Sequence, residues 1–257
     1  MGTVVCRKMA AGACTVGGWY APGAERRHAT RWRHQPALAN LYLHYAFDLW
    51  MDREFPSIPF ERYADDVICH CSNERQAKDL QKRVKARFEA CALTLHPEKT
   101  KIVYCKDDNW RQAHPIVQFD FLGYTFRPRK SKSKNGAYFV GFGPGISNAS
   151  AKAIRQTMRG WKLHLRSDLE LEDLACQVNP VLRGWINYYG AFYKSRLNIV
   201  LNHLDVILSR WAVRKYKALK HHHRHALRWL RGIARRQPLL FAHWAALRGE
   251  RWIIGAA

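Results

Sequence analysis

The most informative segment of the chain reads Phe60-Glu61-Arg62-Tyr63-Ala64-Asp65-Asp66-Val67-Ile68-Cys69. Two adjacent carboxylates stand between an aromatic-rich run and an apolar run, which predicts a strand, a tight turn and a second strand. Because Asp tolerates turn geometry, we expect Asp65 and Asp66 at the tip of a rigid hairpin. Two carboxylates held together repel each other, so a cation should bind beside them, and Mg²⁺ prefers such oxygen ligands. Two-metal sites that transfer phosphoryl groups are built from such carboxylates.

The composition of the chain indicates a polyanionic partner. The 257 residues include 43 Lys and Arg against 20 Asp and Glu, which gives a formal net charge of +23. Basic side chains release counterions from phosphate backbones, and aromatic residues, which make up 12% of the chain, stack on bases. We see no lipidation signal, no secretory signal peptide and no apolar run that could span a bilayer, so a membrane is not the expected partner.

The seven cysteines are scattered, odd in number and without a Cys-x-x-Cys pair, which argues against a disulfide scaffold in a chain of this size. Cys69-His70-Cys71 suggests a zinc site. However, one-residue spacing on a strand sends both thiols to one face and the imidazole to the other. We therefore expect packed thiols in a cytoplasmic protein.

In this strand context, Tyr63-Ala64-Asp65-Asp66 resembles the polymerase motif of reverse transcriptases, in the variant common in group II intron reverse transcriptase/maturases. An Asp-Asp pair by itself is more often a solvated surface turn, so the resemblance depends on the surrounding sequence. Further segments agree with the family in order and spacing. They are Leu38 to Tyr45, Leu93 to Tyr104, Phe119 to Phe126, and Asn179 to Tyr189, the last resembling the signature of the maturase domain, also called domain X.

The resemblance implies roles for individual residues. Asp65 and Asp66 would ligate Mg²⁺, with Asp65 the more critical ligand, and the ions would activate the primer 3′ hydroxyl and stabilise the leaving pyrophosphate. Tyr63 and Ala64 would line the nucleotide site, and Lys99 would lie nearby and neutralise phosphate. The primer grip, a hairpin that positions the primer end, would consist of Phe121, Leu122, Gly123 and Tyr124.

Residues 1–35 depart from the family pattern. In the family a Gly-rich loop precedes the Leu38 segment, whereas Arg31 to Gln35 stands in its place here. The family also needs a third metal-binding Asp on an earlier strand of the palm. Residues 1–35 contain no Asp, and we expect them to leave no room for that strand or for the fingers. We therefore expect an N-terminally truncated reverse transcriptase that does not polymerise DNA by itself.

The periodicity of the remaining sequence predicts further helices and strands. We expect a largely apolar, buried helix over 37–50, an amphipathic helix capped by Ser72 or Asn73 and ending near Ala92, and a strand over 100–104. Beyond a linker, the rest of the chain reads as helical. The expected features there are a cap at Asn148 or Ser150, a short helix over 169–177, a new helix with Pro180 in its first turn, and an apolar stripe of Leu197, Leu201, Leu204, Leu208 and Trp211.

The helical part carries a strongly basic surface. No acidic residue occurs between Val206 and Gly249, whereas Arg and Lys recur throughout. A charge run is usually a solvated face, but a long surface of one sign with interleaved Trp and Tyr favours RNA. Trp185 fits a core position, and Tyr188 and Tyr189 fit either the core or an RNA contact. The candidate RNA contacts are Arg127, Arg183, Tyr188, Tyr189, Lys194, Arg196, Arg210, Arg214 and Lys217.

These observations predict an α+β protein with a partial polymerase palm followed by an all-helical thumb and maturase domain. The expected boundaries are an unassigned lead-in over 1–35, a palm fragment over 36–130, a linker over 131–146 and the thumb and maturase domain over 147–257. The expected function is that of a group II intron-encoded reverse transcriptase/maturase that binds intron RNA for splicing and mobility. The alternatives are a non-enzymatic RNA-binding module and a decayed fragment. Expected partners are group II intron RNA and an RNA template with a DNA primer, and a homodimer is left open.

Overall fold

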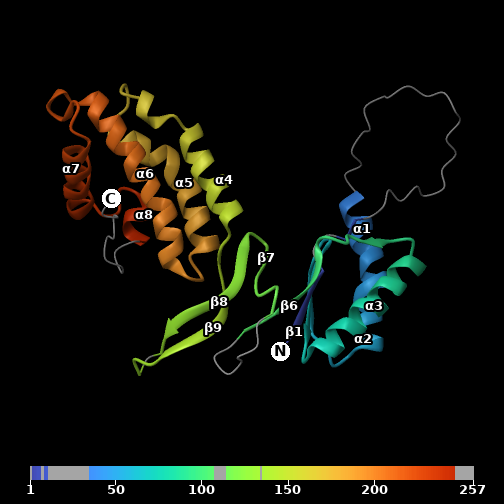
Figure 1. Cartoon of the computed structure of the whole chain (residues 1–257). Coiled ribbons are helices and arrows are strands. Elements are labelled where there is room, and N and C mark those ends of the chain that lie inside the picture. Colours follow the sequence, from blue (N-terminus) through green and yellow to red (C-terminus); the bar gives the residue numbers. More distant parts are fainter. Residues whose placement is uncertain (1, 7–8, 11–34, 107–113, 134, 247–257) are drawn as a thin grey trace, which may run out of the picture. The chain divides into compact units, whose positions relative to one another are not determined.

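The computed structural model describes residues 2–6, 9–10, 35–106, 114–133 and 135–246 (Figure 1). The chain divides into two compact units, each with a hydrophobic core of its own. Unit 1 contains residues 1–119 and 127–142, and unit 2 contains residues 120–126 and 143–257. Unit 1 combines strands with helices and unit 2 is mainly helical, so the predicted α+β class is confirmed.

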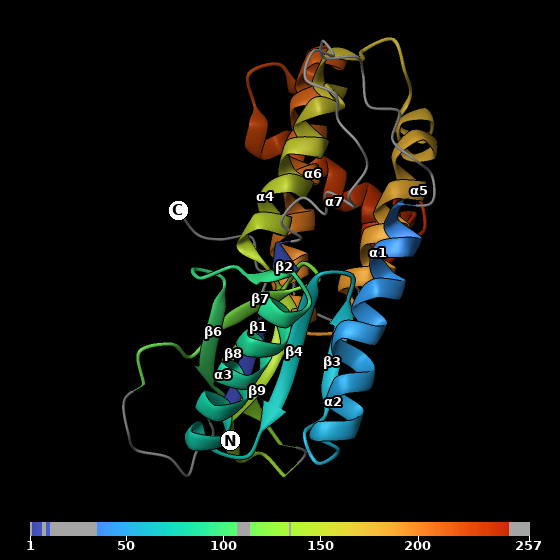
Figure 2. The same ribbon diagram turned by 90° about the vertical axis from the view of Figure 1, so that its right-hand side faces the viewer.

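Unit 1 is built on a four-stranded antiparallel sheet in the order β3-β4-β1-β6, whose strands lie side by side in Figure 2. These strands are β3 (Phe60–Tyr63), β4 (Asp66–Cys71), β1 (Gly2–Cys6) and β6 (Thr100–Tyr104). The predicted hairpin and the predicted strand over 100–104 are therefore present. Two further short strands, β2 (Met9–Ala10) and β5 (Thr94–Leu95), pair with each other.

Strand β1 takes a central position that the sequence did not predict. Gly2 lies opposite Cys71 of β4 and opposite Tyr104 of β6, so both edges of β1 are paired. The β-branched run Thr3-Val4-Val5 favours a strand, and pairing on both sides satisfies its backbone groups. The sequence predicted that residues 1–35 leave no room for an earlier strand. This prediction is wrong for residues 2–6, which form β1. Residues 7–8 and 11–34 lie outside the described residues.

Three α-helices pack with this sheet. They are α1 (Gln35–Leu43), α2 (Leu49–Glu54) and α3 (Glu74–Ala90), and a π-helical turn over His44–Asp48 joins the first two. The fully buried residues of this core come from the π-helical turn, α2, β4 and α3. They include Phe47, Met51, Val67, Cys69, Ala77, Leu80 and Phe88.

The helical predictions for unit 1 hold in part. The helix expected over 37–50 is present, but Leu38 and Leu41 near its start are exposed rather than buried. Burial of an apolar face depends on the element that packs on it, which periodicity does not specify. For α3, the side chain of Asn73 accepts a hydrogen bond from the Gln76 backbone N–H at 2.9 Å, so Asn73 is the cap.

A second sheet has the order β7-β8-β9 and contains β7 (Phe119–Phe121), β8 (Tyr124–Lys132) and β9 (Tyr138–Ile146). Much of the region predicted as a linker over 131–146 is therefore strand. A loop and a hairpin were both open for this linker, and the pairing of β8 with β9 makes it a hairpin, which the run Tyr138-Phe139-Val140 favours.

Unit 2 is a bundle of helices (Figure 1). Its longer helices are α4 (Asn148–Gly160), α5 (Leu171–Tyr189), α6 (Lys194–Lys215) and α7 (His223–Arg236), and its shorter ones are α8 (Ala242–Ala246) and the 3₁₀ turns over Leu163–Leu165 and Lys217–Leu219. The predicted apolar stripe of α6 is buried in the core of this bundle. Within the described ranges, no helix has the length and apolar character needed to cross a membrane.

Two helix boundaries in unit 2 differ from the prediction. The cap of α4 is Ser147, whose hydroxyl accepts from the Ser150 backbone N–H at 3.0 Å, rather than Asn148 or Ser150. Helix α5 is continuous, with Pro180 in its interior instead of at the start of a new helix. Proline is unfavourable in a helix interior, because it lacks the N–H that would bond to the preceding turn. The packing of α5 in the core outweighs the free-energy cost of this missing bond.

Candidate functional site

The predicted strand, turn and strand around the two aspartates is present as the β3–β4 hairpin. Tyr63 pairs with Asp66, which leaves Ala64 and Asp65 as a two-residue loop. Ala64 has a backbone φ of +54°, in the left-handed region that two-residue hairpin turns require. Asp65 and Asp66 are half-buried, whereas Tyr63 is exposed. The hairpin therefore holds both carboxylates at its tip next to an accessible aromatic ring.

Arg62 connects this turn to the helical part of unit 1. Its Nε donates to Asp48 Oδ1 at 2.6 Å and its Nη2 donates to Asp48 Oδ2 at 2.5 Å. Its Nη1 donates to Asn40 Oδ1 and to the backbone carbonyl of Ala64, each at 3.1 Å. The guanidinium thus bridges α1, the π-helical turn and the Asp65 loop. Sequence reasoning assigned no role to Arg62, because the 14-residue separation from Asp48 gives no local signal.

The donor set at the hairpin tip is compatible with Mg²⁺. Asp65 and Asp66 offer carboxylate oxygens, and Mg²⁺ is commonly held by one or two carboxylates together with waters and substrate phosphates. In the described part of the chain, no group of three His, Cys, Asp or Glu side chains gathers as a metal site. Strand β1, the neighbour of β4, carries no carboxylate, and Cys6 at its end lies opposite Val67. Asp65 and Asp66 are thus the two carboxylates at the tip of this hairpin, and β1 adds none beside them.

Lys99 lies at the same end of the sheet as the aspartates. Cys6 of β1 pairs with Val67 of β4 on one side and with Thr100 of β6 on the other. Asp66 directly precedes Val67, and Lys99 directly precedes Thr100. Adjacent strands are about 4.8 Å apart, which separates the two backbones by about 10 Å. Lys99 is thus placed near the hairpin tip but two strands away from it.

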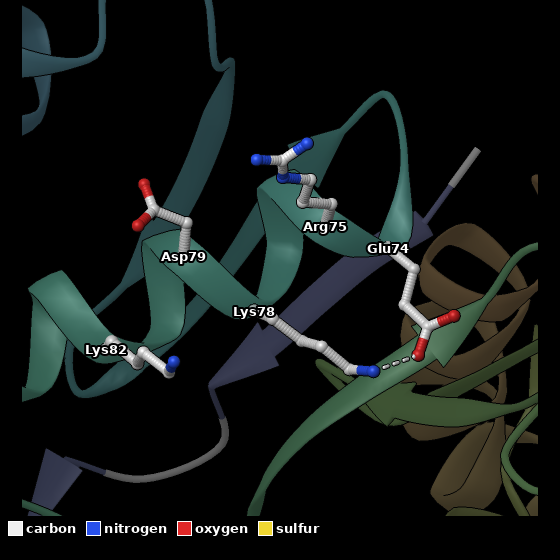
Figure 3. Close-up of a pocket in the computed structure, with 5 residues that line it drawn as sticks. All are labelled: Glu74, Arg75, Lys78, Asp79 and Lys82. Atoms are coloured by element: carbon white, nitrogen blue, oxygen red, sulfur yellow. Dashed lines mark ion pairs between the residues drawn. The ribbon is translucent and has the colours of Figure 1, made fainter.

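The surface of α3 carries a separate hollow, which Figure 3 shows. It is lined by Glu74, Arg75, Lys78, Asp79 and Lys82. Lys78 and Glu74 form an ion pair at 2.6 Å, and this partner holds the pKa of the Glu74 carboxyl below its usual value. Charges of both signs line the hollow and neither hairpin aspartate does, so it does not belong to the candidate site.

The residues predicted as the primer grip form the β7–β8 turn and belong to unit 2. Leu122 and Gly123 have positive φ values of +47° and +79°. The hydroxyl of Tyr188 donates to the Leu122 carbonyl at 2.8 Å, and the hydroxyl of Tyr124 donates to the Tyr188 carbonyl. The Ser150 hydroxyl donates to the Gly123 carbonyl at 3.0 Å. The turn is therefore attached to both α4 and α5.

Gly123 is required at this turn for two reasons. Its φ lies in the region that L side chains rarely adopt. A Cβ at this position would also lie 2.9 Å from the hydroxyl oxygens of Ser150 and Tyr189. The ring of Tyr124 contacts the rings of Tyr188 and Tyr189, with centroid separations of 5.6 and 5.4 Å. Both tyrosines thus support the turn.

The predicted core position of Trp185 is supported by its contacts. Its ring stacks on Trp161 at a centroid distance of 5.6 Å and packs against the buried cluster of unit 2. Tyr189 packs against the same cluster, whereas Tyr188 is 49% exposed. Tyr188 therefore combines a structural hydrogen bond with an accessible face.

The basic candidates for RNA contact fall on several elements. Arg183 is exposed on α5, Lys194 begins α6, and Arg210 and Arg214 are exposed one turn apart on α6. The remaining basic candidates are Arg196, whose guanidinium donates to Asn148 Oδ1 at 2.5 Å, Lys217 in the 3₁₀ turn after α6, and Arg127, which is half-buried on β8. Arg127 belongs to unit 1, and the other basic candidates belong to unit 2.

Comparison with known families accounts for most of the chain. Residues 32–126 match the family model for reverse transcriptase (RNA-dependent DNA polymerase), and residues 151–230 match the group II intron, maturase-specific domain. A search of curated proteins found no match. The first match includes the Asp65-Asp66 hairpin and the turn at Gly123, and the second includes helices α4 to α7 in large part. With both domains in this order, the chain belongs to the group II intron reverse transcriptase/maturase family.

Proposed function

We propose that this protein acts as a maturase that binds group II intron RNA through the basic helices of unit 2, for splicing and mobility. The observation that carries this proposal is the charge of α6 and α7. From Val206 to Gly249 the chain has no acidic residue, and Arg210, Arg214 and Lys217 are exposed. A surface of one sign with accessible aromatic rings such as Tyr188 favours a phosphate backbone with unstacked bases.

For the reverse transcriptase part, we propose that Asp65 and Asp66 hold Mg²⁺ and that Tyr63 and Ala64 line the nucleotide site. Bound there, Mg²⁺ would supply activation of the primer 3′ hydroxyl and neutralisation of phosphate charge. Arg62 fixes the loop that carries Asp65 through its bond to the Ala64 carbonyl. Lys99, at the same end of the sheet, contributes positive charge for phosphates. The turn from Phe121 to Tyr124 holds the primer end.

We also propose that this polypeptide does not extend a primer by itself. Two carboxylates stand at the hairpin tip, and the adjacent strand β1 offers none. The family requires a third metal-binding Asp on an earlier palm strand, and β1 is the earlier strand next to β4. A polymerase with one carboxylate fewer stabilises the charge of phosphoryl transfer less well.

Binding of a transcribed group II intron RNA tests the first proposal. We expect the dissociation constant to rise steeply between low and high salt and to be unchanged by Asp65→Ala, because this substitution leaves the basic helices of unit 2 intact. A structured RNA of the same length and unrelated sequence is the control for specificity. An affinity that does not change with salt would contradict the proposal, and absence of any binding would favour a decayed fragment.

A primer-extension assay with an RNA template tests the second and third proposals. We expect no extension by this polypeptide, whether or not Mg²⁺ is added. Extension that disappears in Asp65→Ala would overturn the third proposal and support the assigned role of Asp65. Intron binding without extension is the result that the non-enzymatic maturase module also predicts.

A cytoplasmic location fits Cys91 and Cys176, which are free thiols. The homodimer that the sequence left open has no support from the family matches, and it forms no part of the proposed function.

A further inference from the structure

The hairpin of β8 and β9 carries exposed aromatic rings that the proposed function does not use. Tyr138, the first residue of β9, is 75% exposed, and its neighbour Phe139 is 45% exposed. Both belong to the part of the hairpin that lies in unit 1, residues 127–142. A single exposed apolar residue is ordinary at a protein surface. What surrounds each ring therefore decides whether it has a ligand.

The turn that closes this hairpin places a cation beside the Tyr138 ring. The backbone N–H of Ser133 donates to the Ala137 carbonyl at 2.8 Å, and the N–H of Gly136 donates to the Ser133 carbonyl at 3.0 Å. Lys132, the last residue of β8, therefore lies opposite Tyr138 on the neighbouring strand (Figure 1). The ammonium of Lys132 lies over the Tyr138 ring, 5.7 Å from its centroid. The cation and the ring thus share one face of the hairpin.

A second lysine lies on the same face, whereas the second aromatic ring does not. Successive side chains of a strand point to opposite faces, so Lys130 shares the face of Lys132 and lies about 7 Å from it along the strand. Both lysines are exposed. Phe139 belongs to the opposite face, where a Cβ added at Gly141 would lie 3.3 Å from its ring. The Phe139 ring is therefore turned along its own strand, while the Tyr138 ring stands beside two cations.

The sequence around the hairpin is basic and contains no acid. Between Asp120 and Asp168 the chain has no Asp or Glu, and four of the six residues from Arg127 to Lys132 are Lys or Arg. Proteins bind single-stranded nucleic acid with this combination of groups. Basic side chains follow the phosphates, and a base stacks on an accessible ring. The charge and the ring of this face therefore fit the same kind of partner.

We propose that Tyr138, Lys132 and Lys130 form a binding surface for an unpaired stretch of the intron RNA. One base stacks on the Tyr138 ring, and the two lysines contact phosphates next to it. This inference rests on the proposed function, which gives the chain an RNA partner, and it adds a contact outside the basic helices of unit 2. A duplex does not fit this surface, because its bases are stacked on each other and offer no free face to the ring.

The first arm of the test maps the stacked base. The full chain is irradiated with a 12-nucleotide unpaired RNA that contains 5-iodouridine, which crosslinks to an aromatic ring stacked on it, and the crosslinked peptides are identified by mass spectrometry. We expect a crosslink at Tyr138 and none at Phe139, and we expect the Tyr138 crosslink to disappear when the RNA is paired with its complement. Crosslinks confined to other residues would overturn the surface. A Tyr138 crosslink of equal yield in the duplex would overturn the assignment to unpaired RNA.

The second arm measures the affinity of variants for the same unpaired RNA by fluorescence polarisation. Tyr138→Leu should weaken binding about 5-fold or more, which is the lower end of what one base stack contributes. Tyr138→Trp keeps a ring and should keep the affinity. The matched control is Phe139→Leu, which removes a ring from the opposite face of the same hairpin and should also keep it.

The lysines are tested by the salt dependence of the Tyr138 crosslink. For Lys130→Gln/Lys132→Gln we expect the slope of log affinity against log salt to decrease by about 1.4, since each phosphate contact with a single strand accounts for about 0.7. The control Arg75→Gln/Lys82→Gln removes the same charge from exposed positions on α3 and should retain the wild-type slope. Wild-type affinity in Tyr138→Leu, or a wild-type slope in the lysine variant, would overturn the surface and leave the proposed function standing. Failure of the wild type to bind any RNA would overturn the proposed function itself.

Discussion

The pair formed by Arg62 and Asp48 supports the most direct test of how the aspartate hairpin is held. We consider Arg62→Met, which keeps an unbranched apolar stem and removes the four hydrogen bonds of the guanidinium. Two of these are charge-assisted bonds to Asp48 at 2.5 and 2.6 Å, and one anchors the Ala64 carbonyl in the turn. The side chains of Arg62 and Asp48 are only 13% and 17% exposed.

The expected cost follows from this burial. Removing one partner of a fully buried pair costs about 3 to 5 kcal/mol, because the remaining charge is left without compensation. Asp48 keeps some access to water and an Nδ1 contact from His44 at 3.2 Å, so we expect a smaller cost of about 2 to 3 kcal/mol for opening the hairpin. Each 1.36 kcal/mol is a factor of ten, so the opening equilibrium should increase by about 30- to 150-fold.

Native-state hydrogen exchange of the segment 60–71 measures this opening directly. Amide protection in β3 and β4 should fall by the same factor of about 30 to 150 in Arg62→Met. The matched control is Lys78→Met on α3, which breaks an ion pair of similar length, 2.6 Å, whose side chains are 63% and 57% exposed. Exposed pairs contribute little, so α3 should keep its protection. Unchanged protection in Arg62→Met, or an equal loss in Lys78→Met, would refute the argument from burial.

Three further outcomes are expected. Gly136→Ala should lower the free energy of unfolding by about 1 kcal/mol, because of the positive φ alone. Gly123→Ala should lower it by about 1 to 2 kcal/mol more, because its Cβ would also meet close contacts. Equal losses of the two variants in chemical denaturation would contradict this. Asp205→Ala should lower the free energy of unfolding by about 3 kcal/mol, measured by thermal unfolding. The reason is that Asp205 Oδ1 accepts from the buried His243 Nε2 at 3.1 Å and from the Trp244 indole N–H at 2.9 Å. A change below about 1 kcal/mol would count against this role. The pKa of His203 is lower in the folded protein than its ordinary value of 6.5. The stability that this difference contributes is present above pH 6.5 and is lost as the pH falls from 6.5 toward the folded pKa. The drop in melting temperature from pH 7.5 to 5.5 should therefore be smaller in His203→Gln than in the wild type.

Local sequence patterns were sufficient for the elements whose signals are short-range. Alternation around Asp65 predicted the β3–β4 hairpin, and periodicity predicted the buried stripe of α6. The same reasoning was wrong at Pro180, because a local helix breaker was outweighed by core packing over the length of α5. For the linker over 131–146 the sequence left a loop and a hairpin open, and the pairing of β8 with β9 shows the hairpin.

The candidate site shows the same division. Asp65 and Asp66 were identified from their motif, since adjacent residues stay adjacent in any fold. The role of Arg62 was not predicted, because its partner Asp48 lies 14 residues away on another element. Tyr188 was left between two interpretations until its bond to the Leu122 carbonyl, 66 residues away in the chain, gave it a structural role.

The sequence by itself determined the family, the hairpin with its two carboxylates and the positive charge that favours RNA, because each depends on residue identity at short spacing. Only the tertiary structure decided that β1 pairs with β4 and β6 and that α4 and α5 hold the Gly123 turn. These features depend on contacts between residues distant in the chain. Such contacts form when the packing of whole elements repays the entropy of bringing them together, and no single segment encodes that balance.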